Sequence, residues 1–254
     1  MSAPPLYLVA TKRERNIIAV EWRIGTNRAK GVVHVIIPEE PPTSHDAAIA
    51  ELTAIRYLVD SRQVGSSLRP HKVFVSQRDI KNLLHQEAGA TPLVPYGRFL
   101  YLYVHQDKLD VEKSKWADGV EIDPARISVT HAMPTNWPGG FCQALGAEIG
   151  ITRHAVERFI ERSQIKNDYW HAFQMIQKRL QSTLMRIVPR EEIARTNPGM
   201  RMDARTMLLH HQGTDTDFLI VKEDEGWVLV TTHAHHQEYV PTMVGTRVEY
   251  RRAT

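Results

Sequence analysis

One short segment of the chain carries three residues whose side chains can bind a phosphate group or transfer a proton to it. His154, Arg158 and Arg162 are spaced four residues apart, so they share one face if the segment is a helix. Arginine binds phosphate through two parallel hydrogen bonds, and histidine transfers protons near neutral pH. The spacing therefore favours a strip of side chains that faces an anion. The alternative is an ordinary solvated face, on which Glu157 and Glu161 form ion pairs.

Histidines form a second concentration of reactive side chains near the end of the chain. His233, His235 and His236 lie close together, and His210-His211 comes earlier. Alternate residues of a strand point to the same side, so a His-x-His pair can chelate Zn²⁺, although the sequence fixes no third ligand. The alternative is a polar rim without a metal, and we expect neither a metal nor a cofactor. The nearby acidic residues, among them Asp217, are expected in solvated turns.

The residues around these groups predict two helices followed by strands. The helices are expected over 153–163 and 169–185. Thr152 is the expected N-cap of the first, and Val156, Phe159 and Ile160 are expected on its buried side. Runs of β-branched and aromatic residues bounded by turn residues predict the strands. These are expected over 206–211, 218–222 and 227–233, with a last extended segment near 246–251.

The pattern His-Ala-x-x-Arg-x-x-x-Arg over 154–162, leading into a second helix and a strand-rich end, resembles small ribonuclease toxins of the RelE- and barnase-like class. The resemblance implies RNA cleavage without a metal ion, by His, Arg, Lys, Glu or Thr side chains on a curved sheet. It makes His154, Arg158 and Arg162 candidate catalytic residues. His233, Thr231 or Thr232 would join them from a late strand.

The first half of the chain reads as three strands, a helix, a strand, a helix and a strand. An antiparallel meander is expected over 6–10, 16–23 and 31–37, and the basic tetrapeptide Lys12-Arg13-Glu14-Arg15 is expected to end its first strand. Ser44 is the predicted N-cap of a helix whose apolar residues recur at helical spacing. The remaining elements are expected over 72–75, 80–85 and 99–104.

This order of elements resembles the ribonuclease H fold over roughly the first 120 residues. Ala50-Glu51-Leu52-Thr53-Ala54 is similar to the family's Ala-Glu-Leu-x-Ala on its first helix, and Trp116-Ala117-Asp118 is similar to its closing segment. The family's chemistry needs four acidic residues that hold two Mg²⁺ ions. Ala10-Thr11-Lys12 and Ser76 stand where the resemblance expects two of them, so we predict a domain that has lost metal-dependent cleavage.

Glu51 matches the family's pattern but lies among apolar residues of the predicted helix. We expect it at the edge of the apolar stripe, where it reaches solvent or pairs with a Lys or Arg. The alternative is a carboxylate set within the apolar face, which is unusual because burial of a charge is costly.

The composition divides the chain into two domains. Residues 134–150 are rich in glycine and proline and are expected to form an irregular linker. The predicted domains are therefore 1–133, a mixed α/β domain with a ribonuclease H-like sheet, and 151–254, a small α+β domain of the α-α-β-β-β type.

Composition indicates a soluble protein. Of the 254 residues, 42% are hydrophobic and 24% charged, and no apolar run is long enough to span a membrane. With a single cysteine, Cys142, and no secretory signal, we expect a cytoplasmic protein without membrane partners.

The charge balance and the two resemblances together predict an association with nucleic acid. The net charge is only +3, so contacts with phosphates depend on local clusters, of which Lys12, Arg13 and Arg15 form the richest. RNA is favoured over DNA, with cleavage or binding by the C-terminal domain. The alternative is a non-enzymatic protein-binding adaptor or inhibitor encoded by a mobile element.

Overall fold

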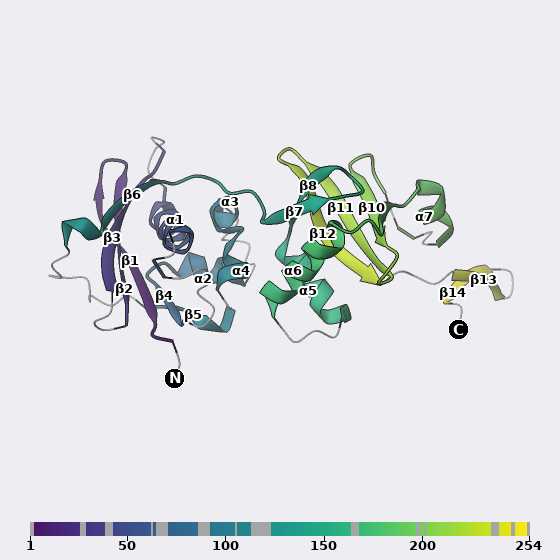
Figure 1. Ribbon diagram of the computed structural model, residues 1–254, viewed down its shortest axis with the longest axis horizontal. Coiled ribbons are helices and arrows are strands. Elements are labelled where there is room, and N and C mark those ends of the chain that lie inside the picture. Colours follow the sequence, from purple (N-terminus) through teal and green to yellow (C-terminus); the bar gives the residue numbers. More distant parts are fainter. Residues whose placement is uncertain are drawn as a thin grey trace. The chain divides into compact units, whose positions relative to one another are not determined.

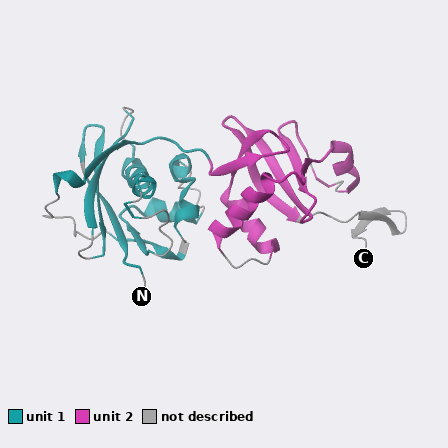
Figure 2. Ribbon diagram, viewed as in Figure 1, with its two compact units in different colours: residues 1–136 teal, residues 137–254 magenta. Residues whose placement is uncertain are grey.

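The chain folds into two compact units, residues 1–136 and 137–254 (Figure 2). A computed structural model describes residues 3–25, 29–38, 43–61, 63–64, 71–85, 92–104, 106–112, 123–163, 168–196, 199–200, 202–234, 239–244 and 247–252. Each unit contains one six-stranded sheet and its own helices, so the chain is of mixed α and β class. No helix in the described part of the chain is both long and apolar enough to cross a bilayer.

The sheet of unit 1 has the strand order β5-β4-β1-β2-β3-β6. The predicted meander is confirmed: β1 pairs with β2 and β2 with β3, all antiparallel. β4 and β5 extend the sheet in parallel beyond β1, and β6 pairs in parallel with β3. The strands are β1 (Leu6–Glu14), β2 (Ile17–Ile24), β3 (Ala29–Ile36), β4 (Val73–Val75), β5 (Leu109–Val111) and β6 (Ile127–His131).

The helices of unit 1 lie on one side of this sheet (Figure 1). The longest, α1 (Asp46–Asp60), buries an apolar face that includes Leu52 and Ile55 against strands β1 to β3. Trp22 from β2 is also buried in the core of the unit. The other helices are α2 (Arg78–Leu84), α3 (Val94–Gly97) and α4 (Leu100–Tyr103), with short 3₁₀ turns at Gln106–Lys108 and Pro124–Arg126.

Three predictions for unit 1 were wrong. Residues 99–104 were expected to form a strand, but Leu100–Tyr103 is helix α4, and its successive residues Leu100, Tyr101 and Leu102 are all buried instead of alternating. The strand beside β4 is β5. The basic tetrapeptide does not end β1, which continues to Glu14 because the hairpin with β2 supplies its backbone partners. The N-cap of α1 is His45, without a side-chain cap, instead of Ser44.

Unit 2 contains a second sheet, with the order β7-β8-β12-β11-β10-β9. β9 to β12 form antiparallel neighbours, and β12 pairs in parallel with β8. The strands are β7 (Gly139–Cys142), β8 (Ala147–Ile151), β9 (Met185–Ile187), β10 (Thr206–His211), β11 (Thr216–Glu223) and β12 (Gly226–Ala234). The helices are α5 (Arg153–Ser163), α6 (Tyr169–Leu180) and α7 (Arg190–Thr196), and a hairpin of β13 (Tyr239–Val244) and β14 (Arg247–Arg252) follows.

The glycine-rich segment predicted as a linker differs from that prediction. Residues 139–142 and 147–151 are strands β7 and β8, which pair as a hairpin at the edge of the second sheet. The glycines permit close backbone approach: a Cβ atom on Gly139 would lie 2.2 Å from the carbonyl oxygen of Ile149. The boundary between the units, at 136/137, lies within the predicted linker. Helix α6 also ends earlier than expected, and Met185 begins β9.

Candidate functional site

The predicted anion-facing strip is carried by helix α5, whose bounds match the prediction. The hydroxyl of Thr152 accepts a hydrogen bond from the backbone N–H of Ala155 at 3.1 Å and so caps the helix. Val156 and Phe159 are buried, as predicted, and the helix packs on β12. Ile160, expected on the same side, is only half-buried. The sequence therefore determines which face of α5 is turned away from the sheet.

The strip itself consists of one exposed histidine and two arginines in different environments. His154 is exposed. Arg158 forms an ion pair with Glu161 at 2.7 Å, which is the arrangement expected of an ordinary solvated face. Partial burial and the neighbouring charge of Arg158 lower the pKa of Arg162, so the two guanidinium groups lie close enough to repel each other. A strip with this excess of positive charge can attract an anion, although Glu161 neutralises part of it.

A different set of ionisable residues forms a straight line across the sheet of unit 2. His210 on β10 lies directly opposite Arg186 on β9 and opposite Asp217 on β11. Asp217 in turn lies opposite His233 on β12. Directly opposed residues of antiparallel strands point to the same face of a sheet, with their Cβ atoms about 5 Å apart. Arg186, His210, Asp217 and His233, here called the transverse row, therefore share one face.

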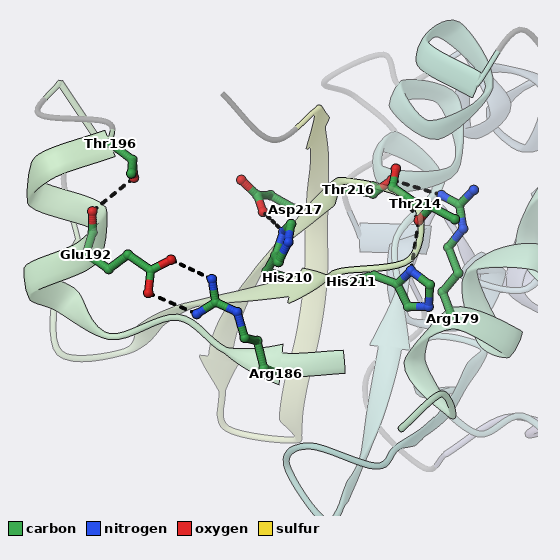
Figure 3. Close-up of polar contacts among 9 residues, drawn as sticks. All are labelled: Arg179, Arg186, Glu192, Thr196, His210, His211, Thr214, Thr216 and Asp217. Atoms are coloured by element: carbon green, nitrogen blue, oxygen red, sulfur yellow. Dashed lines mark hydrogen bonds and ion pairs between the residues drawn. The ribbon is translucent and has the colours of Figure 1, made fainter. Parts of the chain in front are cut away.

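The centre of the transverse row is a buried histidine–aspartate pair. His210 Nδ1 lies 2.8 Å from Asp217 Oδ1, and each residue is only 6% exposed (Figure 3). A small apolar cluster borders the pair on the same face, because Leu208 and Leu219 of the same strands pack with Ile193 of α7. Since a buried carboxylate needs a partner, the pair is a fixed feature of this face. Asp217 was expected in a solvated turn, and this prediction was wrong.

Arg186 ends the transverse row at the edge strand and connects it to α7. Its two terminal nitrogens donate to the Glu192 carboxylate at 2.9 and 2.5 Å (Figure 3). These hydrogen bonds, together with the nearby charges of Glu192 and Asp217, raise the pKa of Arg186. A bidentate arginine–carboxylate pair is the strong geometry for such a contact, so Glu192 fixes the position of the guanidinium.

The helices α5 and α6 lie over the opposite face of the sheet. Arg179 of α6 donates to the Thr216 hydroxyl at 3.1 Å and lies over the ring of Phe159 of α5, so Thr216 points toward the helices. Asp217 is the next residue along β11 and points the other way, and His233 points with it. The structure therefore does not bring His233 together with His154, Arg158 and Arg162, which the sequence placed in one site.

A bulge in β12 decides which residue completes the transverse row. The register between β11 and β12 shifts at Leu219/Ile220, where Val230 is the extra residue. Without that shift Thr232 would lie opposite Asp217, whereas the observed register places His233 there. The carbonyl of Val230 lies 3.5 Å from the hydroxyl of Thr152, the N-cap of α5. The bulge and the start of α5 are thus neighbours.

The His-x-His pair that could chelate Zn²⁺ lies partly outside the structure, because His235 and His236 lie outside the described residues. Within the described ranges, no group of three or more His, Cys, Asp or Glu side chains is arranged to hold a metal ion.

In unit 1, Glu51 is fully buried and acts as a hydrogen-bond acceptor for two strands. Its carboxylate accepts from the backbone N–H groups of Ala10 at 3.0 Å, Ser76 at 3.0 Å and Gln77 at 3.4 Å, and from the Ser76 hydroxyl. The prediction of a solvated or ion-paired Glu51 was therefore wrong. Burial raises its pKa to about 7, although the hydrogen bonds from Ser76, Ala10 and Gln77 oppose the shift.

The contacts of Glu51 bring together the positions that the ribonuclease H resemblance singled out. Ala10 in the middle of β1 and Ser76 just after β4 both donate backbone hydrogen bonds to the carboxylate. Neither residue has a carboxylate, and both oxygens of Glu51 are occupied by N–H donors. Asp118 and its neighbours lie outside the described residues.

One residue of the basic cluster of Lys12, Arg13 and Arg15 forms hydrogen bonds within unit 1. Arg13 donates to Asp46 of α1 at 2.6 Å and to the carbonyl of Arg15 at 3.0 Å. Arg15 is exposed and adopts a left-handed conformation, with φ 54°, in the turn before β2. Lys12 belongs to β1, and its side chain lies outside the described part of the chain. Of these three candidate contacts, Arg13 is committed to joining β1 and α1.

Comparison with protein-family models, curated proteins and solved structures found no match to this chain. The function must therefore be argued from the residues themselves.

Proposed function

We propose that this chain is an RNA-associated protein in which unit 2 cleaves RNA without a metal ion. The observation that carries the proposal is the transverse row, in which His210 and His233 flank Asp217 on one face of three adjacent strands. Two imidazoles and a carboxylate on one face can supply the base and the acid that metal-independent phosphoryl transfer needs. Unit 1 is proposed to be a ribonuclease H-like domain without nuclease activity of its own.

The reaction moves two protons. A base removes the proton of the RNA 2′-hydroxyl as its oxygen attacks the adjacent phosphorus, and an acid protonates the 5′-oxygen as the phosphorus–oxygen bond breaks. The products are a 2′,3′-cyclic phosphate and a 5′-hydroxyl. Histidine serves both roles because its pKa lies near neutrality.

Asp217 gives the two histidines different roles in this proposal. Its oxygen lies 2.8 Å from His210 Nδ1, which favours the tautomer with the proton on Nδ1 and makes Nε2 the basic nitrogen. We therefore assign His210 as the base and His233 as the acid. Two strand spacings, about 10 Å, separate their backbones, and Asp217 lies between them, so a phosphodiester that reaches both rings has to lie above the carboxylate.

The charge that develops on the phosphorane needs a cation. Arg186 is the cationic member of the transverse row and lies next to His210 in the register. Glu192 anchors its guanidinium by two hydrogen bonds. A guanidinium that is held in place stabilises the charge of the transition state more than a mobile one does, because it needs no reorganisation during the reaction.

The proposal for unit 1 rests on its strand order and on Glu51. Three antiparallel strands, a helix and a parallel fourth strand follow one another as in the ribonuclease H order inferred from the sequence. Glu51 occupies the junction of α1, β1 and β4, with Ala10 and Ser76 beside it. A junction filled by N–H donors binds a carboxylate, not a pair of Mg²⁺ ions.

The test is cleavage of end-labelled RNA by the full chain in EDTA. His210→Ala and His233→Ala should each lower the rate by a factor of about 10²–10⁴, the usual contribution of a general acid or base. His154→Ala is the control, because His154 is exposed on α5 and lies outside the transverse row. If His154→Ala abolishes cleavage while His210→Ala does not, the site is the strip on α5 instead.

A second candidate function, a protein-binding adaptor, is favoured by strand β6. This edge strand exposes Ile127 (42%) and Val129 (60%), and Met133 beyond it is 65% exposed. A folded wild-type chain that neither cleaves nor binds RNA would support the adaptor and reject the nuclease.

A further inference from the structure

A second polar cluster lies where β10 ends and β11 begins, on the face of the sheet opposite the transverse row. It consists of Arg179 from α6, His211 from β10 and the threonines Thr214 and Thr216 of the following turn and strand (Figure 3). None of these residues belongs to the site proposed above. We call them the Arg179 cluster.

The Arg179 cluster is held by a connected set of hydrogen bonds. Arg179 donates to Thr216 Oγ1 at 3.1 Å, and Thr216 Oγ1 lies 3.2 Å from Thr214 Oγ1. His211 Nδ1 lies 2.9 Å from Thr214 Oγ1. A backbone hydrogen bond from Thr214 N–H to the His211 carbonyl at 3.2 Å closes the turn. The four side chains are therefore positioned before any ligand arrives.

In the described part of the chain, no acidic side chain forms an ion pair with the cation of this cluster. Among the described residues, the Arg179 guanidinium takes part in one hydrogen bond, to Thr216, which uses one of its five N–H donors. One face of its guanidinium lies over the Phe159 ring, 4.5 Å from the ring centroid. Burial lowers the pKa of Arg179, and burial, with the charges of Arg179 and His210, lowers that of His211. A half-buried cation of this kind is stabilised when an anion binds beside it.

We infer that the Arg179 cluster is a binding site for a phosphate group. A guanidinium binds two oxygens of a tetrahedral anion in its plane, and neighbouring threonine hydroxyls reach the others from the side. Such a group is supplied by inorganic phosphate, by a terminal phosphate of a nucleotide or by the backbone of RNA. The inference stands apart from the proposed nuclease, because it involves the other face of the sheet.

The experiment is a titration of the full chain with sodium phosphate, followed by thermal unfolding and by calorimetry. Sodium chloride at equal ionic strength and pH is the reference. We expect saturable stabilisation by phosphate that chloride does not reproduce. Arg179→Gln should weaken phosphate binding at least tenfold, and Thr216→Val should weaken it several-fold. Lys178→Gln removes a neighbouring exposed charge of α6 and should change affinity less than twofold.

Equal stabilisation by phosphate and chloride in the wild type would overturn the inference. So would phosphate affinity that Arg179→Gln leaves unchanged. If Arg179→Gln does not fold, the Thr216→Val variant and calorimetry on the wild type decide the question.

Three ligands distinguish the source of the phosphate group. Inorganic phosphate, adenosine 5′-monophosphate and an RNA oligonucleotide with a 5′-hydroxyl are titrated separately. Preference for the mononucleotide indicates a terminal phosphate, and preference for the oligonucleotide indicates the backbone. The His210→Ala variant should bind phosphate with the affinity of the wild type. Loss of RNA cleavage can therefore be distinguished from loss of phosphate binding at the Arg179 cluster.

Discussion

Replacing Glu51 by glutamine should change how the stability of unit 1 depends on pH. Burial raises the pKa of Glu51 from 4.5 to about 7, so the folded unit binds a proton more tightly than the unfolded chain. The stabilisation is complete below pH 4.5 and is lost as the pH rises through 7. Integrating the difference in bound protons, unit 1 loses about 2.5 kcal/mol from this group between pH 5 and pH 8.

The glutamine variant cannot titrate, so this part of the pH dependence should disappear. Its amide keeps one oxygen but turns an NH₂ group toward N–H donors of Ala10, Ser76 or Gln77. A buried donor left unsatisfied costs about 1–3 kcal/mol. The variant should therefore be less stable than the wild type at pH 5. The difference between their free energies of unfolding should be about 2.5 kcal/mol smaller at pH 8, because only the wild type loses stability as the pH rises.

Amide hydrogen exchange measured by mass spectrometry follows unit 1 within the full chain. Peptides that cover β1 and β4 report its opening free energy, and peptides from β10 and β11 serve as an internal reference. Glu148→Gln, an exposed glutamate of β8, is the matched control and should behave like the wild type. Parallel pH profiles for wild type and Glu51→Gln would refute this account of the carboxylate.

Three further predictions concern the rest of the chain. Unit 1 should not cleave RNA–DNA hybrids in Mg²⁺, and hybrid cleavage that disappears in Glu51→Gln would contradict this. Arg13→Ala should lower the stability of unit 1 by about 1–3 kcal/mol in chemical denaturation, because Asp46 loses a charged hydrogen bond at 2.6 Å. It should leave the salt dependence of RNA binding nearly unchanged, whereas a slope flattened by about one unit would assign Arg13 to phosphate contact. Gly139→Ala should destabilise unit 2 in calorimetry, because its Cβ would lie 2.2 Å from the Ile149 carbonyl oxygen; a freely tolerated alanine would restore the linker interpretation.

Elements with one clear hydrophobic period were predictable from the sequence. The bounds of α5 match the prediction, because a threonine cap precedes a segment with one apolar face. The strand at 206–211 also matches, and the meander of unit 1 follows from its β-branched runs and turn residues. In these segments local preference and tertiary packing favour the same structure.

Segments whose structure differs from the one that their residue types favour were not predictable from the sequence. Glycines such as Gly139 and Gly150 suggested a linker, but a neighbouring strand and a tryptophan approach these two closely. A Cβ on Gly150 would lie 2.8 Å from the Cβ of Trp137. Leu100–Tyr103 has strand-like residues, yet it is a helix in which the three successive residues Leu100, Tyr101 and Leu102 are buried. Short apolar runs do not distinguish the two structures, because complete burial removes the periodicity.

The contacts of Glu51 depend on chain segments far apart in the sequence. The helical spacing placed Glu51 correctly among apolar residues, but it contained no information about Ala10 and Ser76, which lie 41 and 25 residues away. Backbone N–H groups carry no sequence signature, so a carboxylate that satisfies them is indistinguishable from one that reaches solvent. The resemblance to ribonuclease H was the signal that paired these three positions.

The transverse row depends on the register of the strands. A shift of the register by one residue would turn the side chains of one strand to the other face of the sheet. His210 and Asp217 are opposite each other because the turn between β10 and β11 closes with His211 facing Thr216. A turn longer or shorter by one residue would move Asp217 to the other face of the sheet relative to His210. The sequence analysis gave the two strands but not their register, so it could not predict the pair.

His233 joins the row for a similar reason, through the bulge at Val230. A regular hairpin from the tight turn between Glu223 and Gly226 would place Thr232 opposite Asp217, and His233 would then face the helices. The bulge advances the strand by one residue and exchanges a hydroxyl for an imidazole beside the carboxylate. Because bulges often re-aim a side chain next to a functional site, the position of this one is an independent reason to test His233 before the other histidines.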